Sequence, residues 1–381
     1  MQTFHTAREL RALDPGVTVL LPRWARRESA FAAVDATHLL RLPFNALSHA
    51  WRTTAWSYLE RSWFAWRAAL YLARRGRGAT IYVRDAICAA WFGALFARPL
   101  GATLMYEVHD LEQWNPSRLR SPLARPLVRL VDALAIRRAA RVVTLTGAFK
   151  DYLARAGLKA ADEVAVIPDA YDEARYAPRD RDAARRALGV PAEAFVVTYA
   201  GLTFAYRGLD VLVRAFARLA RDAPGARLYL VGGREGERAD LARLARDLGV
   251  ADAVCLPGQL PQDAVPDYLA AADALVLPGT VSGLNASPLK LFEYAAMARP
   301  VVAVDAPALR EILGDDGASY VASGDEAGLA AALAAVRGDP AGASARAERA
   351  RERVRPFTYR ARAAAILALA AGVARREPAD G

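Results

Sequence analysis

Residues 273–303 read DALVLPGTVSGLNASPLKLFEYAAMARPVVA and contain the clearest local pattern in the chain. An apolar run at 274–277 precedes a Gly-containing loop, a helical pattern from Ser287 and a second apolar run from Val301. This order predicts a strand, a loop, a helix and a strand, which is the repeating unit of a parallel α/β sheet. Ser287 is a good N-cap residue, and Pro288 suits the first helical turn.

The start of this predicted helix has the properties of a phosphate-binding site. Free backbone N–H groups at a helix start carry partial positive charge that a phosphate can neutralise. Glu293 lies roughly 9 Å further along the axis than Ser287, at ~1.5 Å per residue. That distance is about the reach from the diphosphate of a nucleotide to its ribose hydroxyls. The alternative is an ordinary structural unit in which Ser287 and Pro288 only cap a helix.

The segment SPLKLFEYAAMARPVVA (287–303) resembles the nucleotide-sugar motif of retaining glycosyltransferases of family 4, which have the GT-B fold. The resemblance implies that the helix start holds the donor diphosphate through Ser287, Leu289 and Lys290. It also implies that Glu293 holds the ribose. Lys290 is one of three lysines in the chain and opposes the helix dipole at this position, which suggests an anionic ligand.

The chain departs from the family pattern at Asn285. Family members usually carry a second glutamate eight positions before the ribose-binding one, where this chain has the amide of Asn285. An amide can still hydrogen-bond sugar hydroxyls, so Asn285 stays among the predicted donor-binding residues, although it carries no charge.

The composition is that of a globular protein with two domains. The chain has 381 residues, of which 54% are hydrophobic and 24% charged, and this length allows two separate cores. Two cysteines give no disulfide framework, and charged residues stand where a signal peptide would need its apolar region. The longest apolar runs are well short of the ~20 residues that a membrane span needs. We therefore expect a cytoplasmic protein.

Strand patterns alternate with helical patterns along the whole chain. They lie at 17–21, 80–83, 103–108, 141–145, 164–167, 195–199, 227–231, 253–256, 274–277, 301–304 and 319–321. This alternation predicts parallel sheets with helices on both faces, and ligands that bind beyond the carboxyl ends of the strands.

Together with the resemblance, the alternation predicts a GT-B protein, in which two doubly wound Rossmann-like α/β domains face a central cleft. We expect residues 1–175 to form the acceptor-side domain and 176–355 the nucleotide-sugar-binding domain. A last helix, within 356–381, would cross back to the first domain. A helical pattern at 6–13 precedes the first strand pattern, so the strand that normally opens such a domain is expected to be missing or truncated.

The second domain opens with FVVTYAGLTFAYRGLDVLV (195–213). Gly201 follows the strand and lets a diphosphate approach the backbone closely, while Arg207 adds positive charge where the leaving group develops negative charge. The length resembles the family pattern of Gly, Arg, four residues, Lys and Gly. Here Arg207 stands in the place of the lysine and Leu202 in that of the arginine, so one cation is lost.

The stretch TLMYEVHDLEQW (103–114) predicts a strand that ends beside His109, at the carboxyl edge of the first sheet. In the family that this segment resembles, a histidine at this point touches the transferred sugar. His109 is therefore a catalytic candidate together with Arg207 and Lys290. A structural histidine that is satisfied by its neighbours is the alternative.

The first part of the chain is basic and rich in tryptophan. Residues 1–175 hold 25 Lys and Arg against 16 Asp and Glu, and also all seven tryptophans. Within 44–75 an apolar stripe with helical spacing consists of Trp56, Leu59, Trp63, Trp66 and Leu70. We expect this stripe to pack on the core of its own domain. The alternative is a peripheral contact with the inner face of an anionic membrane, where Trp and Arg are favoured.

Taken together, the motifs predict a retaining hexosyltransferase that moves a sugar from a UDP- or GDP-linked nucleoside diphosphate sugar to a glycan, lipid-linked or small-molecule acceptor. No DxD-like carboxylate pair occurs in a suitable loop, so neither a metal nor another cofactor is expected, and no nucleic acid partner is expected. The alternative, motivated by Asn285, Leu202 and the missing first strand, is a noncatalytic GT-B protein that binds a nucleotide sugar or a partner subunit. An epimerase or oxidoreductase is disfavoured, because no GxGxxG follows an early strand.

Overall fold

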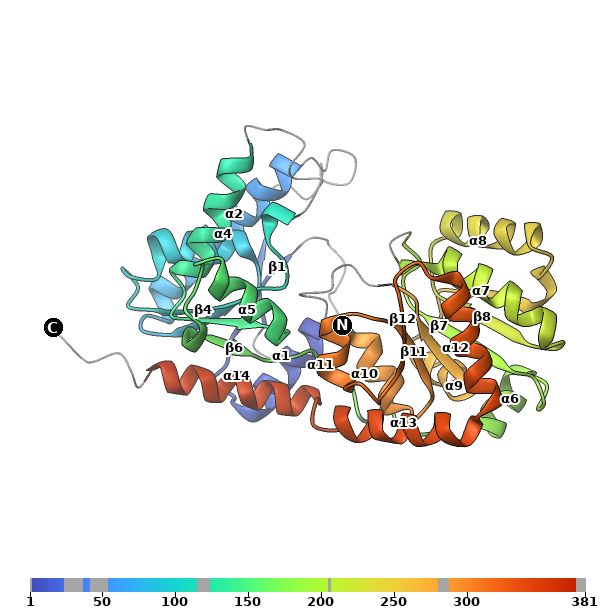
Figure 1. Cartoon of the computed structure of the whole chain (residues 1–381). Helices are drawn as coiled ribbons and strands as arrows, with labels where there is room; N and C mark the ends of the chain where they lie inside the picture. Colours follow the sequence, from blue (N-terminus) through green and yellow to red (C-terminus); the bar gives the residue numbers. More distant parts are fainter. Residues whose placement is uncertain are drawn as a thin grey trace. The chain divides into compact units, whose positions relative to one another are not determined.

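The computed structural model of the chain describes residues 2–23, 37–41, 54–114, 124–204, 207–279 and 288–374 (Figure 1). The chain divides into two compact units. Unit 1 comprises Met1–Pro168 and Tyr359–Gly381, and unit 2 comprises Asp169–Thr358. The boundaries at 168/169 and 358/359 compare with 175/176 and 355/356 in the prediction from sequence, and the last helix belongs to unit 1.

Unit 1 contains a four-stranded parallel sheet in the order β3-β4-β5-β6 and a separate parallel pair, β1-β2. The strands are β1 Val19–Arg23, β2 Thr37–Arg41, β3 Thr80–Val83, β4 Thr103–Glu107, β5 Arg141–Thr144 and β6 Val164–Val166. The helices are α1 Gln2–Leu13, α2 Thr54–Arg75, α3 Ala86–Trp91, η2 Phe92–Phe96, η3 Glu112–Trp114, α4 Ala124–Arg137, α5 Gly147–Arg155, η4 Ala161–Glu163 and α14 Tyr359–Ala374.

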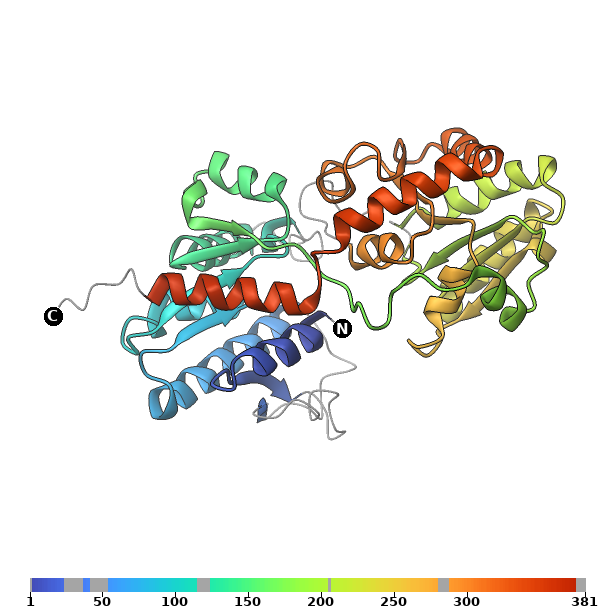
Figure 2. The same ribbon diagram turned by 90° about the horizontal axis from the view of Figure 1, so that it is seen from below.

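The neighbouring strands β4 and β5 show how both faces of this sheet are covered. Leu104 and Tyr106 point into a core shared with α2, α3 and α4, and Val143 of β5 belongs to a second core with Ile366 of α14. Helices α1 and α14 pack side by side (Figure 2). The alternation follows from the two-residue period of a strand. The last helix of the chain, α14, therefore covers one face of the sheet in unit 1.

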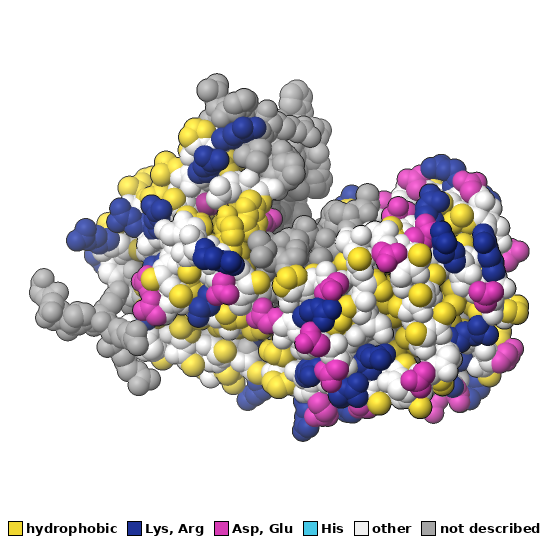
Figure 3. Space-filling model, in the orientation of Figure 1, with side chains coloured by type: hydrophobic (Ala, Val, Ile, Leu, Met, Phe, Trp, Pro, Cys, Tyr) yellow, Lys and Arg dark blue, Asp and Glu magenta, His cyan; other side chains and the backbone are white. Residues whose placement is uncertain are grey.

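Helix α2 turns its tryptophan stripe away from the core, so the expectation that this stripe packs on the core is wrong for most of its length. Leu59, Trp63, Trp66 and Leu70 are between 43% and 53% exposed. The buried face of α2 consists mainly of small residues, Ala65, Ala68 and Ala69, with Leu72. Alanine lets a helix approach its neighbour closely. Figure 3 shows hydrophobic side chains gathered on the surface over α2 and α4.

Unit 2 contains a six-stranded parallel sheet in the order β12-β11-β10-β7-β8-β9. The strands are β7 Val196–Ala200, β8 Arg227–Val231, β9 Val254–Gly258, β10 Ala274–Leu277, β11 Val301–Val304 and β12 Ser319–Val321. The helices are α6 Arg181–Leu188, α7 Leu209–Asp222, α8 Glu235–Asp247, η6 Ala251–Ala253, α9 Val265–Ala270, α10 Leu289–Ala296, α11 Pro307–Leu313, α12 Glu326–Gly338 and α13 Pro340–Val354.

The order of these strands identifies the edge where a ligand is expected. Strand β7 is the first strand of the sheet along the chain, and it pairs with β8 on one side and β10 on the other. The chain therefore progresses outward in opposite directions from β7 and β10, and the carboxyl ends of these two strands form the topological switch point. Ligands of doubly wound sheets bind at this point. Residues 273–303 supply β10 and α10 to this point.

Candidate functional site

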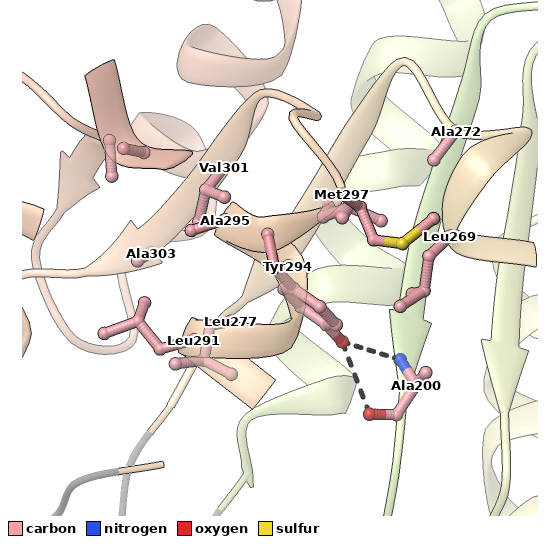
Figure 4. Packing of buried hydrophobic residues seen from close by; sticks show 14 of the residues in the cluster. Ala200, Leu269, Ala272, Leu277, Leu291, Tyr294, Ala295, Met297, Val301 and Ala303 are labelled. Atoms are coloured by element: carbon pink, nitrogen blue, oxygen red, sulfur yellow. Dashed lines mark hydrogen bonds between the residues drawn. The ribbon is translucent and has the colours of Figure 1, made fainter. Parts of the chain in front are cut away.

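Helix α10 is fixed on the end of β7 by a buried tyrosine. Tyr294 is fully buried, and its hydroxyl accepts a hydrogen bond from the backbone N of Ala200 at 2.8 Å and donates one to the carbonyl of Ala200 at 3.3 Å (Figure 4). Apolar side chains of the same helix, Leu291 and Phe292, fill the core below the sheet. These contacts hold the first turn of α10 beside the strand end.

The beginning of α10 differs by one residue from the sequence prediction. The helix starts at Leu289, and Pro288 is its N-cap residue, with φ −73° and ψ 121°, where Ser287 was expected. Proline fills this position without a side-chain hydrogen bond to the helix start. Ser287 and Asn285, both predicted to bind the donor, lie outside the described residues.

Lys290 reaches from the first turn of α10 to the end of β7. Its Nζ donates to the hydroxyl of Tyr199 at 2.7 Å and lies 4.4 Å from the centre of that ring. The Tyr199 hydroxyl in turn donates to the carbonyl of Leu202 at 2.5 Å. The lysine is therefore held at the switch point.

Gly201 leaves the space that Lys290 occupies. A Cβ atom at this position would lie 1.9 Å from Lys290 Cε and 2.1 Å from Nζ, and the backbone has φ +144°. The backbone directly after the neighbouring strand β8 also lies close to Gly201, because a Cβ at Gly232 would lie 2.3 Å from the carbonyl oxygen of Gly201. Glycine is thus required here by a close approach and by a positive φ.

The site holds two cations close enough to affect each other. Burial lowers the pKa of Lys290 to about 7, and the positive charge of Arg207 adds to this shift, while Glu293 opposes it. Arg207 stands just before Gly208, which adopts φ +67° at the N-cap of α7 and packs against the backbone of Pro278 at the end of β10. An anion placed at this edge would relieve the repulsion between the two side chains.

Glu293 lies one helical turn beyond Lys290. Burial raises its pKa to about 7, whereas the charge of Lys290, a hydrogen bond with Tyr176 and the charge of Arg175 act in the opposite direction. Residues three apart share one face of a helix, so the carboxyl group and the ammonium group line the same side of α10. The arrangement offers a cation for a phosphate and, further along, an acceptor for hydroxyl groups.

The structure places Gly201, Arg207, Leu289, Lys290 and Glu293 near the ends of β7 and β10 and along the start of α10. It adds three residues that the sequence reasoning missed: Tyr199, Tyr294 and Tyr176. Tyr199 lies in a strand and Tyr294 on an apolar helix face, where tyrosines are typical core residues, and their partners are 91 and 94 positions away. Tyr176 lies outside the helices and strands, and its partner Glu293 is still further along the chain. In the sequence, Tyr199 and Tyr294 could have been noticed only because Tyr199 lies close to Gly201 and Tyr294 directly follows Glu293.

His109 follows β4 of unit 1 and is engaged by charged neighbours. Its Nε2 lies 2.5 Å from Glu107 Oε1 and 2.8 Å from a guanidinium nitrogen of Arg84, and the side chain is 33% exposed. Glu107 is completely buried, and it also contacts Arg362 of α14 and the Tyr82 hydroxyl. The histidine thus stands at the carboxyl edge of the sheet, as predicted, with its ring held by a buried carboxylate.

The described helices are too short or too polar to cross a lipid bilayer.

Comparison with known proteins finds glycosyltransferase families over most of the chain. Residues 194–339 match the family described as Glycosyl transferases group 1, and residues 1–170 match the Glycosyl transferase 4-like domain. Among curated proteins, the chain is 32% identical over 334 residues to 2-deoxystreptamine glucosyltransferase of Streptomyces kanamyceticus, covering 84% of this chain and 83% of that protein. It is 33% identical over 279 residues to D-inositol 3-phosphate glycosyltransferase of Saccharomonospora viridis, covering 70% of this chain and 64% of that protein.

Solved structures with the same fold cover nearly the whole chain. Sucrose-phosphate synthase from Thermosynechococcus elongatus has a TM-score of 0.78 at 20% identity, covering 97% of this chain and 92% of that one. HepE from Anabaena, solved in complex with UDP, has a TM-score of 0.75 at 20% identity, covering 97% and 96%. At this level of identity the likeness concerns the fold, and the predicted GT-B class is confirmed.

Proposed function

The chain belongs to the glycosyl transferases group 1 family, and we propose that it transfers a hexose from a nucleoside diphosphate sugar, UDP- or GDP-linked, to a hydroxyl-bearing acceptor. Transfer proceeds with retention of anomeric configuration and without a metal ion. The observation that carries this proposal is the group at the end of β7 and the start of α10. There Lys290 and Arg207 are near enough for repulsion to contribute to the lowered pKa of Lys290, and Glu293 lies one turn away.

Each residue has a role in this proposal. Lys290 and Arg207, with the backbone N–H groups at the start of α10, bind the diphosphate and stabilise the negative charge that it gains when the sugar leaves. Glu293 accepts hydrogen bonds from the ribose hydroxyls. Gly201 lets the diphosphate and Lys290 approach the strand end. Asn285 and Ser287, which precede α10 in the sequence, are proposed to bind the donor, and His109 is proposed to contact the transferred sugar.

Nucleotide release from a panel of UDP- and GDP-sugars tests the donor assignment. The full-length protein is incubated with each donor, with and without EDTA, and the free nucleotide is measured. We expect release with at least one donor, no effect of EDTA, and a loss of about 10-fold or more in Glu293→Ala, because a hydrogen bond to a charged group contributes ~1.5–3 kcal/mol. Glu348→Ala, which removes an exposed carboxylate from α13, is the matched control.

Retention is measured separately, from the anomer of the first-formed sugar by NMR. A product of inverted configuration would contradict the proposed mechanism. Release that is equal in Glu293→Ala and Glu348→Ala would contradict the site. Tight donor binding without release for any acceptor offered would instead favour the noncatalytic alternative.

We further propose a cytoplasmic location, which agrees with the two free cysteines, Cys88 and Cys255, of the described chain. The proposed acceptor is a glycan, a lipid-linked molecule or a small molecule. The donor site does not discriminate between these classes, because its residues are proposed to contact the donor.

A further inference from the structure

Large exposed apolar side chains gather on the neighbouring helices α2, η2 and α4 of unit 1. On α2 they are Leu59, Trp63, Trp66 and Leu70, which are 51%, 43%, 53% and 44% exposed. Leu95 of η2 is 51% exposed, and Leu127 and Leu130 of α4 are 57% and 52% exposed. We call these seven residues the α2–α4 surface. Among the described residues, only Leu202 is a further large hydrophobic side chain of comparable exposure.

The three helices that form this surface are packed together. Helix α3 and its continuation η2 lie between α2 and α4 and contact both. The Trp66 ring meets Phe96 of η2 at 4.9 Å and Trp91 of α3 at 5.9 Å between ring centres, both edge to face, so the stripe of α2 continues onto α3 and η2 through aromatic contacts. The helices that carry the exposed residues are therefore held next to one another by the core of the unit.

The charges on these helices have a single sign where they are exposed. Arg67 and Arg74 of α2 and Arg125 and Arg129 of α4 are exposed, and no carboxylate of the described residues lies within 4.0 Å of them. The acidic residues of the two helices point inward. Glu60 is 3% exposed and accepts a hydrogen bond from Trp56, and Asp132 is 2% exposed and accepts from backbone N–H groups.

This combination fits a lipid surface of negative charge. Tryptophan is favoured at the boundary between lipid headgroups and acyl chains. Leucine side chains gain by leaving water, and arginine extends its guanidinium to headgroup phosphates while its methylene groups stay in the apolar layer. A second copy of the chain is a poorer occupant, because a symmetric contact through this surface would place arginines opposite arginines.

We propose that the α2–α4 surface docks unit 1 on an anionic lipid bilayer. Docking is peripheral: the tryptophans and leucines enter the headgroup boundary, and the four arginines contact anionic headgroups. This inference goes beyond the proposed function and does not depend on it, since lipid binding needs no donor. If both hold, the acceptor-side unit is held where a lipid-linked acceptor would be met.

Vesicle sedimentation of the full-length protein tests the proposal. Large vesicles of phosphatidylcholine are compared with vesicles that mix phosphatidylcholine and phosphatidylglycerol. We expect binding to the anionic vesicles that weakens with added salt, together with a blue shift of tryptophan fluorescence. Replacing Arg67, Arg74, Arg125 and Arg129 by Gln should lower the binding constant by about 100-fold or more, at ~1 kcal/mol for each basic residue near the surface.

Two further variants separate lipid docking from general effects. The matched control replaces four exposed arginines of unit 2, Arg186, Arg214, Arg221 and Arg246, by Gln, and should bind as the wild type does. Leu127→Ser with Leu130→Ser removes apolar contact from α4 without touching the aromatic stack of α2, and should lower binding about 10-fold. Donor-dependent nucleotide release in solution should be unchanged in all three variants.

The proposal is overturned if the folded wild type binds neither kind of vesicle, or if both surface variants bind as well as the control. It is also overturned if sedimentation velocity shows a dimer that the α4 variant dissolves, because the surface would then be covered by a second copy. Nucleotide release is a separate measurement, so its failure would contradict the proposed function and leave the lipid result standing.

Discussion

The ends of β4 in unit 1 and β7 in unit 2 occupy the same kind of place in their sheets, but their charges are arranged differently. At β4 the buried carboxylate of Glu107 lies beside His109 and is paired with the guanidinium groups of Arg84 and Arg362. At β7 burial and the neighbouring Arg207 lower the pKa of Lys290 to about 7. A paired network stabilises a unit, whereas a repelled cation at a strand edge is suited to receive an anion.

The largest effect is expected from removing the charge of Glu107. Arg362 is only 4% exposed, and in Glu107→Gln its guanidinium group loses its anionic partner. Breaking a buried pair in this way costs about 3–5 kcal/mol. Urea denaturation followed by tryptophan fluorescence measures this effect in unit 1, because all seven tryptophans lie within residues 1–168.

The matched control is Glu163→Gln, which removes the ion pair between a partly exposed carboxylate and Lys159 in the same unit, where the tryptophans report. Surface pairs contribute ~0–1 kcal/mol, so the urea midpoint of this variant should stay near that of the wild type. If Glu107→Gln also loses less than about 1 kcal/mol, the network at β4 does not stabilise the unit and the contrast with β7 fails.

The second prediction concerns the pH dependence of donor binding. The ammonium form of Lys290 binds the diphosphate, and its pKa is lowered to about 7, so the charged fraction falls as pH rises above that value. Donor affinity should then weaken by up to about tenfold for each further pH unit. Titration calorimetry with a nucleotide sugar, whose diphosphate carries no titrating proton in this range, measures the profile.

Lys290→Arg is the diagnostic variant for this profile. Arginine stays charged at all these pH values, so the decline above neutral pH should disappear even if the affinity near neutral pH is lower. A decline that persists in Lys290→Arg would assign the titration to another group.

The third prediction uses two glycines that differ in their surroundings. Gly201→Ala places a Cβ 1.9 Å from Lys290 Cε at φ +144°, whereas Gly225→Ala meets nothing within 4 Å at φ +89°. Both substitutions carry backbone strain of about 1–3 kcal/mol. Only Gly201→Ala should also displace Lys290 and weaken donor binding, by about 10-fold, since charge-assisted hydrogen bonds contribute ~1.5–3 kcal/mol. Equal donor affinity in the two variants would show that donor binding does not depend on Lys290 occupying the space beside Gly201.

The strands of both units were predictable, and the reason is local. Apolar, β-branched runs fix a strand by themselves, so the bounds of β3, β8, β10, β11 and β12 agree with the prediction residue for residue. Strand β2, a five-residue THLLR, was missed because it has neither a long apolar run nor clear alternation. Gly201 was predicted from its place after a strand, Lys290 from its place at a helix start and Glu293 from its spacing, and their roles stay predictions that the resemblance implies.

The exposed stripe of α2 was not predictable, because periodicity shows which side chains share a face and not which face is covered. Two stripes of α2 have helical spacing, one of large residues such as Trp63 and one of alanines such as Ala65, and the alanine stripe is the buried one. Contacts between distant segments were equally hidden. The hydrogen bonds of Tyr294 to Ala200, and of Lys290 to Tyr199, join positions more than 90 residues apart.

The smallest expected effect concerns the cation that the family pattern has and this chain lacks. Leu202 is 45% exposed at the loop after β7, and its carbonyl accepts a hydrogen bond from Tyr199, the residue that also binds Lys290. If Lys290 compensates for the missing arginine, Leu202→Arg should tighten donor binding only about threefold or less in the wild type. In the Lys290→Met background the same substitution should recover about tenfold, because it then supplies a positive charge that Lys290 no longer provides beside Arg207. Calorimetry on the four proteins of this double-mutant cycle measures the coupling. Equal gains in both backgrounds would mean that positions 202 and 290 act independently. Lys290 would then not compensate for the arginine that is missing at position 202.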